Sequence, residues 1–303
     1  MSKIHQIGAF IRHLLTAWNT SGEAIHSPYL FRLVRFVLRD ENAYYCFRDI
    51  ERRRELLLAC EDSLDVVDYG SAGSPEGLHV QRRVCDIAKN HLESARVGQV
   101  LFRIVNFLHE EEKRPLQILE LGTSLGITTA YLASVDSRNK VVTMEGSEAV
   151  LRVAQGVWKM LKLENIEWIQ GNIDDTLYNI YSVQSSDVRA QNSEFRCQNS
   201  EFRCQSSDVR CQSSEAKGER IDLAFVDANH TYEATMRYAD FLLNRLTEKG
   251  ILVLDDIHYS EQMERAWSEL KADPRVTTSM DLYYVGLLFV DTHYLKRDYR
   301  IRI

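Results

Sequence analysis

The fold is decided by the stretch Ile118-Leu119-Glu120-Leu121-Gly122-Thr123-Ser124-Leu125-Gly126. An apolar run ends in an acid, a glycine-spaced turn follows, and a helical pattern begins at Ile127. A strand, a tight loop and a helix N-terminus in this order present backbone N–H groups to a nucleotide-like ligand. The spacing Glu-x-Gly-x-x-x-Gly lacks a glycine that the dinucleotide fingerprint brings close to a pyrophosphate. An acid in its place favours a positively charged ligand without phosphates, such as S-adenosylmethionine.

Acidic residues recur at the ends of the apolar runs that follow. Lys140 to Glu145 ends in an acid nineteen residues after Gly126, where nucleotide-binding α/β folds bind a ribose diol. Further runs are Ile166 to Gln170, Ile221 to Asp227 and Gly250 to Asp256. Strands that alternate with helices predict a doubly wound, mostly parallel sheet, with ligands beyond the carboxyl ends of its strands. The acids expected at that edge are Glu120, Glu145, Asp227, Asp255 and Asp256.

The glycine loop and three further stretches resemble the class I S-adenosylmethionine-dependent methyltransferases. The stretches are Val97-Gly98-Gln99-Val100-Leu101, Phe225-Val226-Asp227-Ala228-Asn229-His230 and Leu254-Asp255-Asp256. Within that class the chain is most similar to the small-molecule O-methyltransferases of the catechol and caffeoyl-coenzyme A type, over roughly residues 96–290. It also resembles bacterial methyltransferases of unnamed substrate. The resemblance implies a Rossmann-like α/β fold with seven strands and methyl transfer to a small-molecule acceptor.

The resemblance also implies a set of cofactor contacts. The residues concerned are Glu120, Gly122, Thr123, Ser124, Gly126, Glu145, Asn172 and Asp227. Glu120, Gly122 and Gly126 would hold the methionyl end, and Glu145 the ribose. Thr123 and Ser124 would hydrogen-bond the cofactor carboxylate. The amide of Asn172 would contact the adenine edge, with a role as an ordinary turn residue left open.

The carboxylates after two adjacent strands suggest how an acceptor is activated. By resemblance, Asp227 and Asp255 match metal-ligand positions and Asp256 stands where an Asn is commoner, which suits Mg²⁺. His230 stands where the catechol-type enzymes have a lysine base, and imidazole can remove a proton near neutral pH. Asp227 and His230 are therefore the predicted catalytic pair. His258 is a candidate for orienting Asp255, and the alternative is that Asp256 caps a helix and His230 orders a loop.

Composition narrows the function and leaves two alternatives. A net charge of −7 argues against a nucleic-acid partner, and no apolar run among the 303 residues has the length of a membrane span. Six cysteines without a Cys-x-x-Cys motif predict reduced thiols and a cytoplasmic enzyme, for which a homodimer stays open. The alternatives are a non-catalytic S-adenosylmethionine-binding scaffold and a nicotinamide-dependent oxidoreductase. The missing glycine disfavours the latter.

Residues 1–95 are expected to form a helical cap over a methyltransferase domain at 96–303. Apolar residues recur at helical spacing from Ile4 to Trp18, and this face is expected to pack on the protein's own core. Ser27-Pro28 predicts a helix start, with helices towards Leu38 and from Phe47 to Cys60. Val66 to Ser74 has the look of a second glycine loop but lacks the ribose acid downstream, so a loop near the active-site mouth is expected.

A tandem repeat with a period of seven residues occupies 184–218. Its apolar residues are spaced two and five apart, whereas a coiled coil needs spacings of three and four. An odd period also moves successive apolar pairs to opposite faces of a strand. The tract is rich in Ser, Gln and Asn, so it predicts a mobile polar insert between the third and fourth strands.

Overall fold

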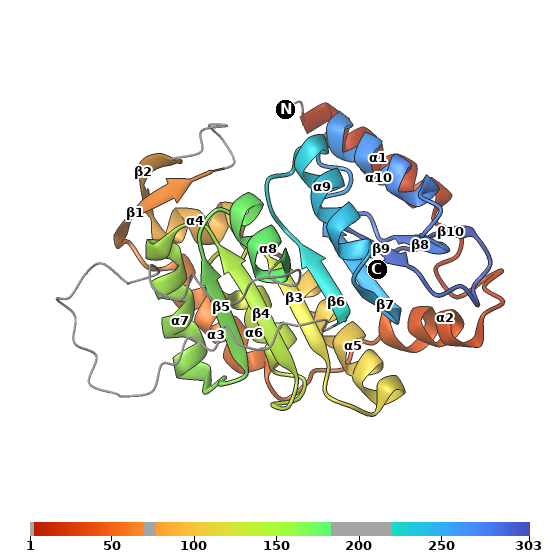
Figure 1. Cartoon of the computed structure of the whole chain (residues 1–303), viewed down its shortest axis with the longest axis horizontal. Coiled ribbons are helices and arrows are strands. Elements are labelled where there is room, and N and C mark those ends of the chain that lie inside the picture. The colour runs from red at the N-terminus through yellow and green to blue at the C-terminus, as the bar shows by residue number, and fades with distance from the viewer. Residues whose placement is uncertain (1–2, 70–76, 183–219) are drawn as a thin grey trace.

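The computed structural model describes residues 3–69, 77–182 and 220–303 and shows an α/β fold around one large sheet (Figure 1). Its strands are β3 (Gln117–Leu121), β4 (Lys140–Glu145), β5 (Ile166–Gln170), β6 (Ile221–Val226), β7 (Leu246–Asp255), β8 (Thr278–Asp281), β9 (Val285–Phe289) and β10 (Arg297–Arg300). The predicted α/β fold is confirmed. In the described part of the chain this sheet has eight strands rather than seven, because β10 adds an edge strand beside β8. Three of the four residues of β10 are charged, so no apolar run marks it.

The topology of the sheet creates the place for a ligand. The strand order is β10-β8-β9-β7-β6-β3-β4-β5, and β9 runs antiparallel to both of its neighbours. From β3 the chain moves outward to β4 and β5 and then returns to β6 on the other side of β3. A crevice opens beyond the carboxyl ends of the strands where the winding reverses in this way. The glycine loop after β3 and Asp227 after β6 meet at this point.

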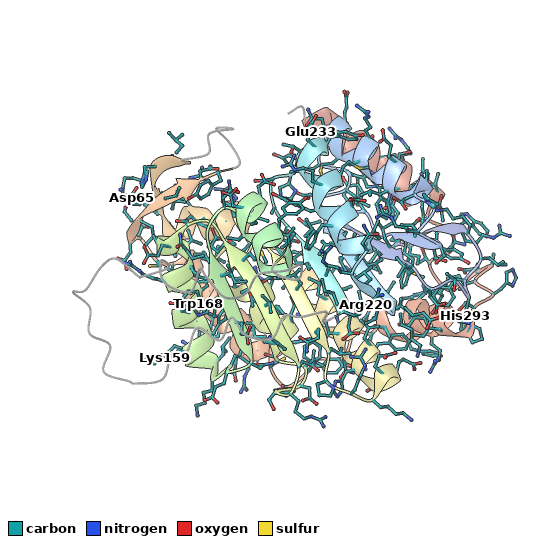
Figure 2. The ribbon with its side chains drawn as sticks, in the orientation of Figure 1. Asp65, Lys159, Trp168, Arg220, Glu233 and His293 are labelled. Atoms are coloured by element: carbon teal, nitrogen blue, oxygen red, sulfur yellow. The ribbon has the colours of Figure 1, made fainter. Side chains whose placement is uncertain are left out.

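Helices cover both faces of the sheet. They are α5 (Ala95–Glu112), α6 (Ile127–Ala133), α7 (Glu148–Leu161), α8 (Ile173–Ser182), α9 (Tyr232–Leu243) and α10 (Glu261–Ala272). Alternate strand side chains enter two apolar cores, as Ile118 and Leu119 of β3 do. The core with Ile118 lies against α5, and the core with Leu119 lies against α8, α9 and α10; Figure 2 shows the side chains between these layers. Burial on both faces explains why the central strands are continuous apolar runs.

The segment before this domain combines helices with a β-hairpin. Its elements are α1 (Lys3–Thr16), α2 (Pro28–Arg32), a π-helical turn η1 (Leu33–Val37), α3 (Phe47–Leu58), β1 (Ser63–Asp68), β2 (Leu78–Arg83) and α4 (Val84–His91). The helix start at Ser27 is confirmed, since its hydroxyl accepts the N–H of Leu30 at 3.4 Å. The antiparallel pair β1–β2 corrects the expected cap of helices alone, and Val66 to Asp68 belong to a strand rather than to a loop (Figure 1). Residues 70–74 of the expected loop lie outside the described residues, so that part stays a prediction. Among the described residues, β1 and β2 pair only with each other. Most of their side chains are polar and not buried, so an apolar pattern could not identify them as strands.

Helix α1 forms where the spacing predicts, but its apolar face does not pack on the core. Of the α1 side chains that the structure describes, Ala9 and His13 are the buried ones. The exposed apolar side chains in and just after the helix are Ile7, Phe10, Ile11, Leu14, Leu15 and Trp18. The expected docking was therefore wrong. The helix instead lies alongside α10, where Arg12 approaches Glu264 at 3.9 Å (Figure 1).

Other expectations concern the remaining parts of the chain. Within the described ranges, no helix combines the length and the apolar character needed to cross a bilayer. The described cysteines Cys46, Cys60 and Cys85 are free, and the other three cysteines lie outside the described residues, so the expectation of reduced thiols stays a prediction. The repeat at 184–218 lies outside the described residues, so its predicted mobility stays a prediction.

Candidate functional site

The loop after β3 is held tightly against β4 and β6. Gly122 and Thr123 both donate their backbone N–H groups to the carbonyl oxygen of Met144, at 3.0 and 3.1 Å. The N–H of Asp227 donates to the carbonyl oxygen of Leu121 at 2.8 Å. Gly122 has φ +98°, and a Cβ atom there would lie 2.0 Å from the carbonyl oxygen of Asp227. This turn therefore requires glycine, and the close approach brings the glycine loop and Asp227 into one site.

Glu145 at the end of β4 is bound to the same loop. Its carboxylate accepts the N–H of Ser124 at 2.9 Å and the N–H of Ser147 at 2.9 Å. Burial raises the pKa of Glu145 to about 7, against the lowering effect of these backbone hydrogen bonds. Ser124 has φ +48°, and its buried hydroxyl oxygen has no hydrogen-bond partner. A buried polar atom without a partner is costly, so this hydroxyl fits a bound ligand.

Glu120 and Thr123 lie beneath the loop rather than on its surface. Glu120 is fully buried, and its Oε2 accepts hydrogen bonds from Thr129 at 2.5 Å and from Thr143 at 2.6 Å. Burial raises the pKa of Glu120 to about 8, and its Oε1 has no partner. The hydroxyl of Thr123 is hydrogen-bonded to that of Thr143 at 2.6 Å. These contacts support the loop from inside, and the direct cofactor contacts expected of both residues stay predictions.

Gly126 and Asn172 have local structural tasks. Gly126 is the N-cap of α6 with φ +78°, and its carbonyl oxygen accepts the indole N–H of Trp158 at 2.9 Å. A Cβ atom at Gly126 would lie 2.6 Å from that indole nitrogen, so the packing of α7 on this turn requires glycine. Asn172 accepts the N–H of Asp174 at 3.1 Å at the start of α8. This is the turn role that the sequence left open, and contact with adenine stays a prediction.

Asp227, His230 and Asp255 converge beyond the ends of β6 and β7. One potential ligand atom of each residue lies within 4.8 Å of the others. His230 Nε2 is 3.2 Å from Asp227 Oδ1. Asn229 and His230 have φ values of +62° and +27°, and the amide of Asn229 donates to the hydroxyl of Tyr238 at 2.7 Å. This strained turn directs His230 back onto Asp227, so the sheet assembles the predicted catalytic pair.

The carboxylates that surround His230 favour binding of a proton or a cation among them. Burial lowers the pKa of His230, but the hydrogen bond and the charge of Asp227 outweigh it, and the pKa is raised. The charges of Asp256 and Glu93 act in the same direction. Asp255 is only 3% exposed, and its Oδ1 has no hydrogen-bond partner. Burial, with the charges of Asp227 and Glu93, raises the pKa of Asp255 well above its ordinary value, so the cluster attracts a proton or a cation.

Glu93 is a member of the cluster that the sequence did not reveal. It lies in the loop before α5, and its carboxyl group is close enough to that of Asp255 for the two to share a proton. Burial raises the pKa of Glu93 to about 7. Because Glu93 follows no strand of the sheet, the pattern of acids at strand ends could not find it. The available signal was its place just before the helix that resembles a cofactor-covering helix.

Two other residues proposed from the sequence lie apart from the three converging ligand atoms. Asp256 has φ +52° and is not in that group, and its carbonyl oxygen accepts the N–H of Tyr259 at 2.9 Å. The cap of α10 is Ser260, so the alternative role of Asp256 as a helix cap is wrong. His258 contacts Asp281 and Glu264, each at 3.1 Å. The expected role of His258 beside Asp255 is therefore wrong.

Comparison with known proteins gives one family match. Residues 119–257 match a family described as "Methyltransferase domain". The matched range contains the glycine loop, Glu145, Asp227 and Asp255, which the fold brings to one edge of the sheet. No curated protein matches the chain.

Solved structures with a similar fold include two from bacteria. One is the O-methyltransferase from Bacillus cereus in complex with SAH, which is 18% identical over 80% of this chain and 90% of that chain, with a TM-score of 0.50. The other is a candidate O-methyltransferase from Klebsiella pneumoniae, which is 15% identical over 83% of this chain and 92% of that chain, also with a TM-score of 0.50. Similarity at this level of identity establishes the Rossmann-like methyltransferase fold.

Proposed function

We propose that the chain is an S-adenosylmethionine-dependent methyltransferase, and that it methylates a hydroxyl oxygen of a small molecule. The match of residues 119–257 to a methyltransferase domain supports this proposal. The observation that carries this proposal is the pair of His230 and Asp227, 3.2 Å apart beside the glycine loop. A hydroxyl must lose its proton to become a good nucleophile, and an imidazole backed by a carboxylate can accept that proton near neutral pH. The pair supports a general base for oxygen methylation.

S-adenosylmethionine binds, in this proposal, over the loop after β3. The proposed contacts are Glu120, Gly122, Thr123, Ser124, Gly126, Glu145, Asn172 and Asp227. The buried and unpartnered hydroxyl oxygen of Ser124 supports a polar ligand at this loop. When bound, the cofactor supplies a methyl group on a sulfonium, which a nucleophile attacks in line. The residues therefore have to hold two reactants in that alignment, which is the main contribution to such a reaction.

His230 takes the acceptor proton through its second ring nitrogen. Nε2 faces the carboxylate of Asp227, which can only accept, so in the neutral ring Nε2 carries the hydrogen and Nδ1 carries the lone pair. Nδ1 is then the proton acceptor, and Asp227 holds the ring in this tautomer. The imidazolium formed by proton uptake is stabilised by the charges of Asp227, Asp256 and Glu93. The tyrosine ring of Tyr259, 5.9 Å away between centroids, flanks the imidazole.

Assistance by a divalent metal is a further part of the proposal. The unpartnered Oδ1 of Asp255 fits a cation, and Asp227 with Asp255 would be its carboxylate ligands. The converging group offers two carboxylates and one imidazole, whereas the sequence suggested an all-oxygen set of Asp227, Asp255 and Asp256 for Mg²⁺. An imidazole donor suits Mn²⁺ or Zn²⁺ better than Mg²⁺, and an ion bound through His230 would replace His230 as the base. When bound, such an ion would lower the pKa of an acceptor hydroxyl and orient it.

The experiment compares His230→Ala with His109→Ala. His109 makes a similar pair with Asp136 at 3.1 Å. It lies in the last turn of α5, at the edge of the sheet opposite to the candidate site. Turnover is measured with labelled S-adenosylmethionine and a panel of catechols and phenols as probe acceptors. His230→Ala should lower kcat by roughly 10²–10⁴-fold, with partial rescue at high pH, while cofactor affinity is retained. His109→Ala should leave kcat unchanged.

The same assay tests the metal and the non-catalytic alternative. Chelator-treated protein is assayed alone and after addition of Mg²⁺ or Mn²⁺. Full turnover in chelator would remove the metal from the proposal and leave His230 as the base. Unchanged turnover in His230→Ala, with metal dependence intact, would mean that the metal alone activates the acceptor. Cofactor binding without turnover of any metabolite in a cell extract would favour a non-catalytic scaffold.

A cytoplasmic homodimer completes the proposal. The free thiols of Cys46, Cys60 and Cys85 support a reducing compartment. Six exposed apolar side chains on and just after α1 support self-association, because monomeric proteins rarely expose large apolar patches. Light scattering should give twice the chain mass of 35.1 kDa, and Leu15→Lys should shift the protein to the monomer. A monomer at all concentrations would refute the dimer.

A further inference from the structure

A second cluster of metal-ligating side chains lies outside the methyltransferase site. It consists of His13 on α1, His258 in the segment after β7 and Asp281 at the end of β8, with one potential ligand atom of each within 4.8 Å of the others. His13 Nδ1 is 3.2 Å from Asp281 Oδ1, and His258 Nε2 is 3.1 Å from Asp281 Oδ2. Two imidazoles therefore face one carboxylate. His13 and Asp281 are each only 4% exposed.

Each ring has an inner nitrogen that faces Asp281 and an outer nitrogen that faces another acceptor. The hydrogen bond of the outer nitrogen determines whether the inner nitrogen carries a hydrogen. His13 Nε2 is 3.3 Å from the carbonyl oxygen of Ile301, and His258 Nδ1 is 3.1 Å from a carboxylate oxygen of Glu264. Carbonyl and carboxylate oxygens can only accept, so the outer nitrogens of neutral rings carry the hydrogens. The inner nitrogens then direct lone pairs at the ionised Asp281. This arrangement is repulsive unless positive charge lies between the rings and the carboxylate.

One divalent cation between the rings and the carboxylate would supply that charge in place of two added protons. His13 Nδ1 is buried and lacks a hydrogen-bond partner, although it points at the carboxylate. Metal-binding histidines usually donate their other N–H to a carbonyl or a carboxylate, and both rings here have such a partner. We propose that His13, His258 and Asp281 bind a divalent transition-metal ion, with Zn²⁺ as the first choice for two imidazoles and one carboxylate.

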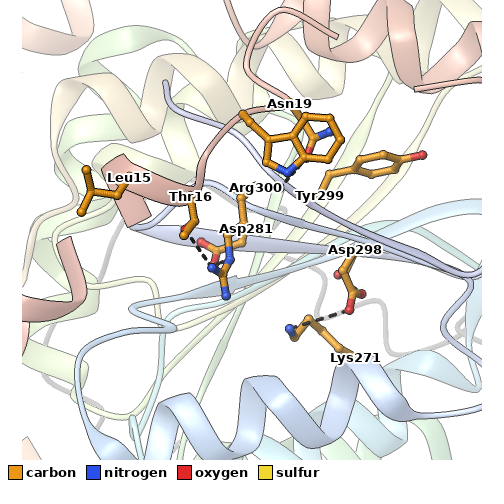
Figure 3. A pocket seen from close by; sticks show the side chains of 10 residues that line it. Leu15, Thr16, Asn19, Lys271, Asp281, Asp298, Tyr299 and Arg300 are labelled. Atoms are coloured by element: carbon orange, nitrogen blue, oxygen red, sulfur yellow. Dashed lines mark hydrogen bonds and ion pairs between the residues drawn. The ribbon is translucent and has the colours of Figure 1, made fainter. Parts of the chain in front are cut away.

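The surroundings of the cluster are compatible with a cation. Arg300 Nε lies 3.7 Å from Asp281 Oδ2, and Arg12 lies 3.9 Å from Glu264, so both arginines are farther from these carboxylates than the histidines are. Figure 3 shows Arg300 between Asp281 and Thr16, at a cavity of about 510 Å³ that Asp281 lines.

A metal at this place explains how α1 is attached. The described side chains that α1 buries are Ala9 and His13, and Phe10 packs its ring edge-on against Tyr283 at 4.9 Å between centroids. This is little apolar area to hold a helix of 14 residues. The ion would join α1 to β8 and to the segment that carries His258. The next residue, Tyr259, packs against the ring of His230. The cluster is thus a structural metal site that links the N-terminal helix to the border of the methyltransferase site.

The test uses the full chain, stripped with a chelator and reloaded with Zn²⁺ or Co²⁺ alone. The wild type should bind an equivalent of metal that is lost in His13→Gln and in His258→Gln. The visible spectrum of bound Co²⁺ should change in both variants, because each removes a nitrogen ligand. Asp227→Asn should keep this equivalent, since Asp227 belongs to the other cluster. This comparison distinguishes metal bound by His13, His258 and Asp281 from metal bound at the proposed catalytic site, so the two proposals can fail independently.

The matched control is His293→Gln. His293 lies 2.8 Å from Asp291 and 3.2 Å from Glu248, so it also belongs to a group with metal-ligating atoms. Its side chain is 77% exposed at the border of the molecule (Figure 2). An exposed group of this kind binds weakly because water competes for the ligands. His293→Gln should therefore keep the metal content and the Co²⁺ spectrum of the wild type.

The unmutated protein gives a second readout, because loss of a buried histidine also perturbs folding. Zn²⁺ at a hundredfold excess over its Kd should raise the Tm by about 5–10 °C, and a chelator should reverse this rise. Zn²⁺ should also protect α1 from proteolysis. The proposal is overturned if the wild type holds no metal beyond what Asp227→Asn removes. It is equally overturned if both histidine variants fold and keep the full metal content.

Discussion

Substitution of Gly122 by alanine tests whether the glycine loop and the catalytic pair form one unit. The new Cβ atom would lie 2.0 Å from the carbonyl oxygen of Asp227, and contacts below about 3.0 Å are essentially never seen. The loop and the end of β6 must therefore separate by at least about 1 Å. The φ of +98° at this position adds backbone strain of about 1–3 kcal/mol for a residue with a side chain. Separation would also weaken the 2.8 Å hydrogen bond from Asp227 to Leu121.

The expected cost is about 2–4 kcal/mol of unfolding free energy, from strain and one weakened buried hydrogen bond. At about 2–4 °C per kcal/mol for a large domain, the Tm should fall by about 5–15 °C. The affinity for S-adenosylmethionine should fall, and so should kcat, because Asp227 orients His230. The matched control is Gly156→Ala within α7, where a Cβ atom meets nothing within 4 Å. That change should stabilise by about 0.5–1 kcal/mol, since alanine is the better helix former.

The measurements are differential scanning fluorimetry, calorimetric titration with S-adenosylmethionine, and turnover. Both variants are prepared and measured side by side, so that any general effect of an added methyl group cancels. An unchanged Tm and an unchanged cofactor affinity in Gly122→Ala would refute the steric argument. A loss in Gly156→Ala as large as that in Gly122→Ala would refute it too.

Further predictions concern the cofactor site and the insert. Glu145→Ala should weaken S-adenosylmethionine binding in calorimetry by about 1–3 kcal/mol, and a wild-type affinity equal to that of the variant would contradict this. The pKa of Glu145 is about 7, and protonation removes its negative charge and turns one acceptor oxygen into a donor, so the wild-type Kd should rise as the pH falls below about 7; a flat profile from pH 8 to 6 would argue against it. Trp158→Phe removes the hydrogen bond to Gly126 and should cost about 1 kcal/mol of stability in a denaturant titration, unless that bond is not formed. Replacing residues 184–218 by a Gly-Ser linker should leave Tm and cofactor affinity nearly unchanged, and a large Tm loss would show that the repeat packs.

Local patterns predicted the central strands and the glycine loop. Buried parallel strands are apolar on both faces, so runs such as Ile221 to Val226 are visible without any knowledge of their neighbours. The turn glycines are equally visible, because spacing in the sequence corresponds to position in one short loop. A strand with a polar sequence gives no such signal when backbone hydrogen bonds to a neighbouring strand hold it in place. The charged edge strand β10 and the hairpin β1–β2 are strands because of their partners.

The candidate site was predicted in part. Acids at the ends of parallel strands lie at one edge of the sheet, so the sequence could predict that Asp227 and Asp255 lie close together. Whether a side chain turns toward the cluster depends on backbone dihedral angles that the sequence does not display. The positive φ of Asp256 and its absence from the converging group illustrate this, as does the pairing of His258 with Asp281. Glu93 comes from a loop far away in the sequence, and only packing brings it to Asp255.

The sequence by itself determined the α/β class, the glycine loop and the row of acids, because each depends on residues within one strand–loop–helix unit. The tertiary structure alone decided which of those acids share a site, and that His13 meets Asp281 across 268 positions of the chain. It also turned the apolar face of α1 outward, against its pattern. The physical reason is that periodicity reports a helix's two faces, whereas the contacts available from the rest of the fold decide which face is buried.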